Sequence, residues 1–233
     1  MRPLFIALRI AGALAVVAAI VGQLIVSLQF WTATEVRDLA TSITNFFSFF
    51  TIQSNVATAV AFAIGAVLLL RGGADAVDPR WYGVLRACVT TYMVTTGVVY
   101  NLLLRGVELP QGSTLGWSNE VLHVVVPILA LVDWLFAPGR RRLGWGTVGV
   151  IVLYPIVWIV YTLIRGPFIF NDLTGALGWY PYPFLNPLGE GGYGTVALWS
   201  ALIAVLIGGV GVGVVAITRA RQGATPGVEA GAL

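Results

Sequence analysis

The chain has 233 residues, of which 58% are hydrophobic and only 10% are charged. Soluble domains carry about 25% charged residues, so this composition excludes an ordinary water-soluble globule and indicates an integral membrane protein. The net charge of +3 comes from arginine alone, and the scattered arginines form no basic strip of the kind that binds nucleic acid.

Apolar stretches of about 20 residues, the length that crosses a bilayer, recur six times along the chain. The first is longer than the roughly 7–15 residues of a signal-peptide core, so we expect it to be retained as a span. Short polar or glycine- and proline-containing segments separate the stretches. The sequence therefore predicts an all-α polytopic bundle of six transmembrane helices, at about 4–30, 43–70, 81–104, 118–136, 145–164 and 195–217.

The arginines also predict the orientation of the bundle. Most of them fall on one side of the alternating spans, namely Arg2, Arg9, Arg71, Arg80, Arg140, Arg141, Arg142, Arg219 and Arg221. By the positive-inside rule both termini are then cytoplasmic. We expect one domain over residues 1–219 and a disordered tail over 220–233. The absence of lysine beside many alanines, valines and glycines suggests a bacterial chain, and hence the plasma membrane.

The second predicted span contains an unusual polar block within the segment "FFSFFTIQSN" (46–55). Spacings of four, three, four and three predict one polar stripe along a helix, made of Thr44, Ser48, Thr51, Asn55 and Thr58. Such a stripe can serve helix packing, with hydroxyl groups bonded to their own backbone. It can also line a site inside the bundle, and the stripe by itself leaves both interpretations open.

The fourth predicted span opens "SNEVLHVVVP" and contains the only histidine, His123. Ionisable residues inside spans are uncommon and indicate functional sites. The alternative is a buried histidine satisfied by a backbone carbonyl or by Asn119, one helical turn away. Glu120 either orients His123 or is an interfacial carboxylate. Near the other end of the span, Asp133 is expected to be a solvated terminal charge.

The predicted topology brings these two spans together at one depth. Thr51 lies about eight residues, roughly 12 Å, from the outer end of its span, and His123 about five residues, roughly 8 Å. A neutral imidazole can take the proton of a hydroxyl and turn it into a nucleophile. Asn55 and Asn119, each one turn from a proposed catalytic residue, are candidate donors to an oxyanion.

Further polar and aromatic residues are expected near the same depth, where they can contact a substrate. Tyrosine and arginine at that level also serve as interfacial anchors, the role that we favour for Arg105. For Arg165 we favour binding of a carboxylate. The candidate substrate-binding residues are Gln53, Ser54, Tyr100, Asn101, Tyr161, Arg165, Tyr182 and Asn186.

Several of these segments resemble one known family over most of the chain. "FFTIQSN", "NEVLHVVVP" and "YPIVWIVYTLIRGP", which continues into "WYPYPFLNP" and "GGY", are similar to the androgen-induced-gene and androgen-dependent TFPI-regulating membrane proteins. The animal members are multi-span threonine hydrolases that cleave fatty acid esters of hydroxy fatty acids. The resemblance implies that Thr51 and His123 correspond to their intramembrane threonine and histidine. The polar run 53–55 and the proline-rich aromatic segment look like the bacterial branch.

Two functions follow from these patterns. The leading hypothesis is an intramembrane threonine hydrolase that cleaves lipid esters and needs no metal or other cofactor. The alternative is a non-enzymatic lipid or small-molecule binder or carrier that uses the same outer-leaflet pocket. A proton-coupled transporter would need ionisable residues near the middle of the bilayer, where the predicted spans offer almost none. The expected partners are a lipid or fatty-acyl ester and the surrounding membrane lipids.

Overall fold

The computed structural model describes residues 1–73, 76–107 and 113–220. Six helices in this part of the chain are long and apolar enough to cross a membrane: Arg2–Ala33, Phe50–Arg71, Arg80–Leu104, Gly116–Phe136, Gly146–Phe168 and Gly192–Ala220. The predicted all-α fold with six spans is therefore confirmed, and the chain is a multi-pass membrane protein. Beyond residue 220, the predicted tail is outside the described residues.

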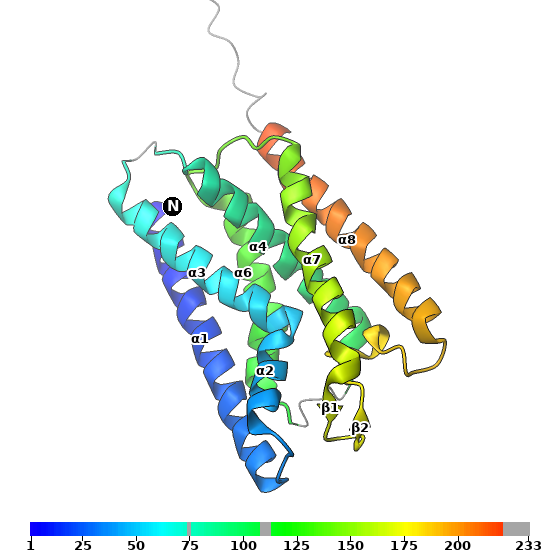
Figure 1. Cartoon of the computed structure of the whole chain (residues 1–233). Coiled ribbons are helices and arrows are strands. Elements are labelled where there is room, and N and C mark those ends of the chain that lie inside the picture. The colour runs from blue at the N-terminus through cyan, green and yellow to red at the C-terminus, as the bar shows by residue number, and fades with distance from the viewer. Residues whose placement is uncertain (74–75, 108–112, 221–233) are drawn as a thin grey trace, which may run out of the picture.

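The spans alternate in direction, so the N-terminus and the end of the last helix lie at the same end of the bundle (Figure 1). The helices are α1 (Arg2–Ala33), α2 (Leu39–Ser48), α3 (Phe50–Arg71), α4 (Arg80–Val99), α5 (Gly116–Glu120), α6 (Val126–Phe136), α7 (Gly146–Arg165) and α8 (Gly192–Ala220). Two π-helical turns, η1 (Tyr100–Leu104) and η2 (Val121–Val125), extend α4 and join α5 to α6. Two 3-10 turns are η3 (Gly166–Phe168) and η4 (Pro183–Leu185).

A small antiparallel hairpin follows the fifth span. Its strands are β1 (Phe170–Asn171) and β2 (Ala176–Leu177), with Phe170 paired to Leu177. We call the end of the bundle that carries this hairpin the hairpin end. The opposite end, which carries the N-terminus and Ala220, is called the terminal end (Figure 1).

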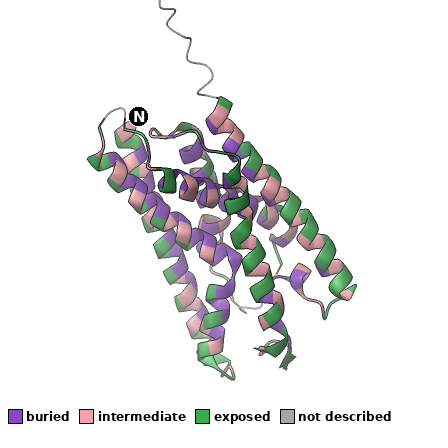
Figure 2. Ribbon diagram, turned by 45° about the horizontal axis from the view of Figure 1, so that its top comes forward, coloured by how far each residue is buried: buried purple, intermediate pink, exposed green. Residues whose placement is uncertain are grey.

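The outer surface of the bundle is apolar where lipid would cover it. Exposed residues run along the outward faces of the helices in Figure 2. On α7 and α8 they include Val150, Leu153, Val157, Val160, Leu198, Leu202 and Val205. An apolar surface of this extent is unusual on a soluble protein, whereas in a bilayer it is the surface that lipid chains contact.

The second span is divided at Phe49. This residue is extended, with φ −64° and ψ 130°, so that α2 ends at Ser48 and α3 begins at Phe50. Its ring packs edge-on against Trp179 and Tyr182 of the segment after the hairpin, with ring centroids 5.7 and 5.6 Å away. We attribute the break to this packing.

The break corrects the prediction of one continuous polar stripe. Thr44 and Ser48 lie on α2, where their hydroxyl groups bond to the carbonyls of Ala40 and Thr44. The remaining members, Thr51, Asn55 and Thr58, lie on α3. The change of direction between the two helices gives Thr51 a new setting, the first turn of a helix.

A network of buried charges joins the helices near the terminal end. Arg9 of α1 contacts Asp133 of α6 at 2.7 Å, and Arg86 of α4 contacts Asp133 at 3.0 Å and Asp78 at 2.5 Å. The expectation that Asp133 is a solvated terminal charge was wrong, because its side chain is only 10% exposed and pairs with two guanidinium groups. Buried charges are tolerated when they are paired in this way.

Candidate active site

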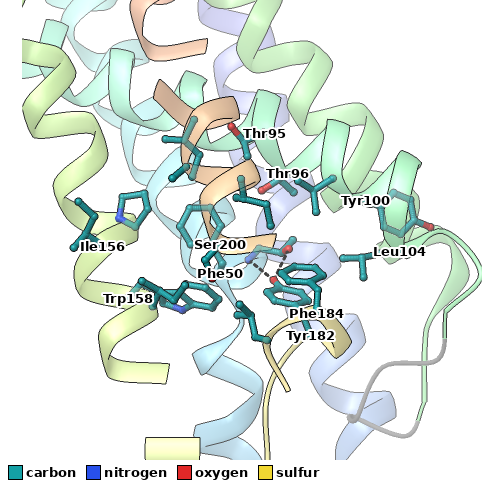
Figure 3. A pocket seen from close by; sticks show the side chains of 18 of the residues that line it. Phe50, Thr95, Thr96, Tyr100, Leu104, Ile156, Trp158, Tyr182, Phe184 and Ser200 are labelled. Carbon is teal, nitrogen blue, oxygen red and sulfur yellow. Dashed lines mark hydrogen bonds between the residues drawn. The ribbon is translucent and has the colours of Figure 1, made fainter. Parts of the chain in front are cut away.

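A cavity of about 380 Å³ lies within the bundle, between α3, α4, α7 and α8. Figure 3 shows its wall, to which η4 and the segment before it contribute Tyr182 and Phe184. The wall is largely apolar. Its polar side chains include Thr51, Thr95, Thr96, Tyr100, His123, Tyr182 and Ser200. Four of the residues predicted from the sequence are thus brought to one cavity: Thr51, Tyr100, His123 and Tyr182.

Thr51 is held in place by the phenol of Tyr182. The Thr51 N–H donates to the Tyr182 hydroxyl at 3.2 Å, and the two hydroxyl oxygens lie 3.1 Å apart (Figure 3). Thr51 is the second residue of α3, so its N–H belongs to the first turn, where amides have no partner within the helix. Tyr182 supplies that partner. The oxygen of Thr51 therefore lies close to the positive end of the α3 dipole.

Side chains also satisfy the carbonyl groups that the break leaves free. The Gln53 amide donates to the Phe47 carbonyl at 2.8 Å, and the Trp158 indole donates to the Ser48 carbonyl at 2.9 Å. The Tyr154 hydroxyl in turn donates to the other end of the Gln53 amide. Gln53, which the sequence nominates as a substrate contact, does not line the cavity and instead caps the end of α2.

Hydrogen bonding fixes the tautomer of His123. Its Nδ1 lies 2.9 Å from the Asn119 carbonyl, and a carbonyl oxygen can only accept, so Nδ1 carries the proton. In the neutral ring Nε2 then has a free lone pair. No hydrogen bond to Nε2 occurs in the part of the chain that the structure describes. His123 is one of the residues that line the cavity.

A proline accounts for the local conformation around His123. Pro127 lacks an N–H, and in a regular α-helix its ring would clash with the carbonyl four residues earlier, which is that of His123. The chain forms the π-helical turn η2 at this point. Isolated π-helical turns occur frequently at functional sites.

The other π-helical turn, η1, lies against η2, the turn that contains His123. The Tyr100 ring stacks on the His123 ring at a centroid distance of 4.2 Å, and the Asn119 side-chain amide donates to the Tyr100 hydroxyl at 2.5 Å. Glu120 does not contact His123 but forms an exposed ion pair with Arg105 at 2.9 Å. Orientation of His123 therefore comes from the Asn119 backbone and from Tyr100.

Thr51 and His123 face the same cavity from different helices. Among the described residues no hydrogen bond joins them: Thr51 Oγ1 bonds to Tyr182, His123 Nδ1 bonds to Asn119, and His123 Nε2 has no partner. Proton transfer between them requires a water molecule, a substrate or a rotation of the threonine side chain.

Asn55 ties the two helices of the site together. Its amide nitrogen donates to the Thr51 carbonyl at 2.9 Å and to the Leu122 carbonyl at 3.2 Å, which links α3 to η2. Both amide protons are thereby used. Asn55 does not line the cavity, and its oxygen is buried without a hydrogen-bond partner among the described residues, as is the hydroxyl of Ser54.

The remaining candidates lie outside the cavity. Arg165 donates to the Asn45 side chain at 2.7 Å, and its guanidinium carbon lies 5.7 Å from the Trp179 ring centroid. Tyr161 pairs with the Ser48 hydroxyl at 3.1 Å. Asn101 bonds within its own helix and to Arg105, and Asn186 forms a turn with the Leu188 N–H.

Arg165 is adjacent to a second hollow at the hairpin end, of about 470 Å³. Its partners Asn45 and Trp179 both line that hollow, which has charged residues such as Arg37 and Asp172 in its wall. Phe49 also lines it, while the neighbouring Phe50 lines the inner cavity. Phe49 and Phe50 therefore lie between the two spaces.

Part of the wall of the inner cavity, on α7 and α8, is exposed. The exposed wall residues include Ile156 on α7 and Ala201 and Ala204 on α8.

The sequence pattern did not identify several residues of the cavity wall, notably Thr95, Thr96, Trp158 and Ser200. The pair of threonines in "TTYMVTTG" is a polar signal inside a span, but its helix face cannot be assigned without the neighbouring helices. No group of three or more His, Cys, Asp or Glu side chains that could hold a metal ion occurs in the described ranges.

Fold and site together define a six-span α-helical membrane protein with an internal cavity. No family model, curated protein or solved structure matches the chain. The proposals below therefore depend on the geometry of this chain and on the sequence resemblance.

Proposed function

We propose that the protein is a membrane-embedded lipid ester hydrolase with Thr51 as nucleophile and His123 as general base. The observation that carries the proposal is that the Thr51 hydroxyl and the imidazole of His123, with Nε2 unprotonated, line one apolar cavity. The exposed part of the cavity wall on α7 and α8, which a bilayer would cover, supports a lipid substrate.

The proposed reaction proceeds through an acyl-threonine. Thr51 Oγ1 attacks the ester carbonyl carbon, and its proton passes to His123 Nε2. Collapse of the tetrahedral intermediate breaks the bond to the alcohol oxygen, which leaves with the proton from His123. Water then attacks the acyl-threonine with the same proton transfers and releases the carboxylic acid. Catalytic hydrogen bonds are often absent or long in unliganded enzymes and form in the substrate complex.

The first turn of α3 and Tyr182 support stabilisation of the oxyanion. The Thr51 N–H and the Tyr182 hydroxyl meet beside Thr51 Oγ1, where negative charge develops on the substrate oxygen. Burial raises the pKa of Tyr182, against the opposing effect of its hydrogen bonds with Thr51. The phenol therefore stays protonated and keeps a proton to donate. This assignment replaces Asn55 and Asn119, whose side-chain amides bond to other groups, and it requires the Thr51 N–H to exchange Tyr182 for the substrate oxygen.

The experiment is turnover of a chromogenic long-chain acyl ester by the purified protein in detergent. Thr51→Ala and His123→Ala should each reduce kcat by at least ~100-fold, the usual minimum effect of losing a general base. Thr58→Ala is the matched control, because Thr58 is a buried threonine of the same helix that bonds to the Ser54 carbonyl and does not line the cavity. Full activity of Thr51→Ala would exclude Thr51 as the nucleophile.

A non-enzymatic lipid carrier is the second candidate. It is favoured by the bond between Thr51 and Tyr182, which satisfies the hydroxyl without any base. A carrier would bind the ester and release it unchanged, with no dependence on His123. Measurement of binding and turnover on the same ester separates the two functions.

We also propose that the terminal end faces the cytoplasm of a bacterial plasma membrane. Support comes from the arginines near that end, including Arg2, Arg71, Arg80 and Arg219. A reporter fused after residue 220 should be active only if it is cytoplasmic, and activity of a periplasm-specific reporter at the same position would reverse the orientation.

A further inference from the structure

Three hydroxyl groups in the cavity wall have no hydrogen-bond partner among the described residues. They belong to Thr95 and Thr96 of α4 and to Ser200 of α8, and each oxygen is buried. Thr95 and Thr96 are 3% and 6% exposed. All three residues line the inner cavity, and Figure 3 shows them around it on two different helices.

The hydroxyl groups of these three residues differ from those of three buried threonines elsewhere in the protein. Thr58, Thr91 and Thr162 donate to the carbonyl four residues earlier in their own helices, at 2.7, 2.9 and 2.9 Å. That bond is the usual way in which a hydroxyl is satisfied inside a span. The hydroxyl groups of Thr95, Thr96 and Ser200 lack it. Buried polar groups in proteins are nearly always bonded, so three exceptions at one cavity indicate a partner that enters the cavity.

The three hydroxyl groups also lie at a common depth. Thr96 precedes Leu104, the last residue of its span, by eight residues, and Ser200 follows Gly192, the first residue of α8, by eight residues. Each is therefore about 12 Å from the hairpin end of its helix. Tyr100, which stacks on His123, lies one turn nearer the hairpin end than Thr96. The hydroxyl groups are thus offset along the cavity from the imidazole.

We propose that Thr95, Thr96 and Ser200 form a polar subsite for a second oxygen-bearing substituent of the lipid, a hydroxyl or oxo group within the chain and separate from the ester that is cleaved. Hydroxyl groups both donate and accept, so they suit a neutral oxygen of either kind. No arginine or lysine of the described ranges lines the cavity, and a carboxylate or phosphate would therefore lack a counter-charge from them there. The role of these hydroxyl groups as a substrate subsite depends on the proposed hydrolase function, whereas their binding of an oxygenated chain does not require catalysis.

The test is competitive displacement of a fluorescent fatty acid from the purified full-length protein by stearic acid and by 10- or 12-hydroxystearic acid. The wild type should bind at least one hydroxylated isomer about tenfold more tightly than stearic acid. The triple variant Thr95→Val, Thr96→Val, Ser200→Ala should lose this preference and bind stearic acid as tightly as the wild type or more so. Valine has the shape of threonine without its hydroxyl, so the cavity keeps its form.

Thr91→Val is the matched control, because it removes a buried α4 hydroxyl that is already bonded to the Ala87 carbonyl and does not line the cavity. It should keep the preference. If the triple variant fails to fold, the single variants Thr96→Val and Ser200→Ala should each reduce the preference. Equal affinity of the wild type for plain and hydroxylated chains, or an undiminished preference in the variants, would overturn the subsite.

The outcome for the subsite is distinguishable from the outcome for the hydrolase. Preference for a hydroxylated chain without ester turnover would retain the subsite and reject the proposed function. Turnover dependent on Thr51 without any preference would retain the function and reject the subsite.

Discussion

Tyr182 holds Thr51 by two contacts, one to the backbone N–H at 3.2 Å and one between the hydroxyl oxygens at 3.1 Å. The two residues are far apart in the sequence and meet because the chain breaks at Phe49. The break exposes the first turn of α3, and the segment after the hairpin folds back to cover it. The polar block of the second span is therefore a helix junction as well as a candidate catalytic site.

Removing the phenol should affect catalysis more than stability. Tyr182→Phe keeps the ring that packs on Phe49 and Phe184 but loses both bonds to Thr51. We expect kcat to fall by ~100-fold, the scale of losing one oxyanion donor. The free energy of unfolding should fall by only about 1 kcal/mol.

The control for that variant is Tyr82→Phe, which removes a buried phenol bonded to the Ala61 carbonyl far from the cavity. Tyr82→Phe should lose a similar amount of unfolding free energy and keep its kcat. An unchanged kcat in Tyr182→Phe would mean that Tyr182 serves only as packing.

The phenol of Tyr182 should remain protonated at the pH at which an ordinary tyrosine is half ionised. Burial raises its pKa above the ordinary value of 10.0. Ultraviolet titration of tyrosinate should therefore give the same curve for the wild type and Tyr182→Phe up to pH 10. A deficit of half a tyrosinate in the variant at pH 10 would show that the phenol is accessible to solvent.

The cap on α2 should contribute to stability and to the position of Thr51. Gln53→Leu removes the donor to the Phe47 carbonyl and the acceptor for Tyr154. We expect a loss of about 1–2 kcal/mol in the free energy of unfolding, measured in detergent, and a lower kcat because the junction loosens. Gln29→Leu on the exposed face of α1 is a control that should change neither quantity. Unchanged stability in Gln53→Leu would show that water replaces the cap.

The buried and exposed ion pairs should differ sharply in their effects. Asp133→Ala leaves Arg9 and Arg86 without their shared partner in the interior, which should cost about 3–5 kcal/mol of unfolding free energy. Glu120→Ala breaks a pair with Arg105 whose side chains are 46% and 48% exposed, and it should change stability far less, because water screens an exposed pair. Thermal unfolding of both variants in the same detergent measures the difference. Equal losses of unfolding free energy in the two variants would contradict the assignment of Asp133 as the buried partner of Arg9 and Arg86.

The sequence predicted most of the fold because span length and apolarity are local properties. The third span, expected at 81–104, runs from Arg80 to Leu104, and the fourth, expected from residue 118, begins at Gly116. Helical periodicity failed at Phe49, where packing against Trp179 and Tyr182 overrides it. A pattern within one segment carries no information about such distant partners.

The same distinction, between local properties of the sequence and contacts with distant segments, applies to the candidate site. Depth along two spans was enough to nominate Thr51 and His123, and both line the cavity. The partner of Thr51 and the unbonded hydroxyl groups of Thr95 and Thr96 depend on how helices face one another, which the sequence does not encode locally. Asp133 was misjudged for the same reason, since its partners Arg9 and Arg86 lie on other spans.

The most direct test of the central claim is to find the residue that becomes acylated. The purified protein would be incubated with a long-chain acyl ester or a fluorophosphonate, quenched in acid, digested and mapped by mass spectrometry. The account predicts an adduct on Thr51 that is absent in Thr51→Ala, slowed in His123→Ala and unchanged in Thr58→Ala. An adduct on another residue, or undiminished labelling of Thr51→Ala, would contradict it.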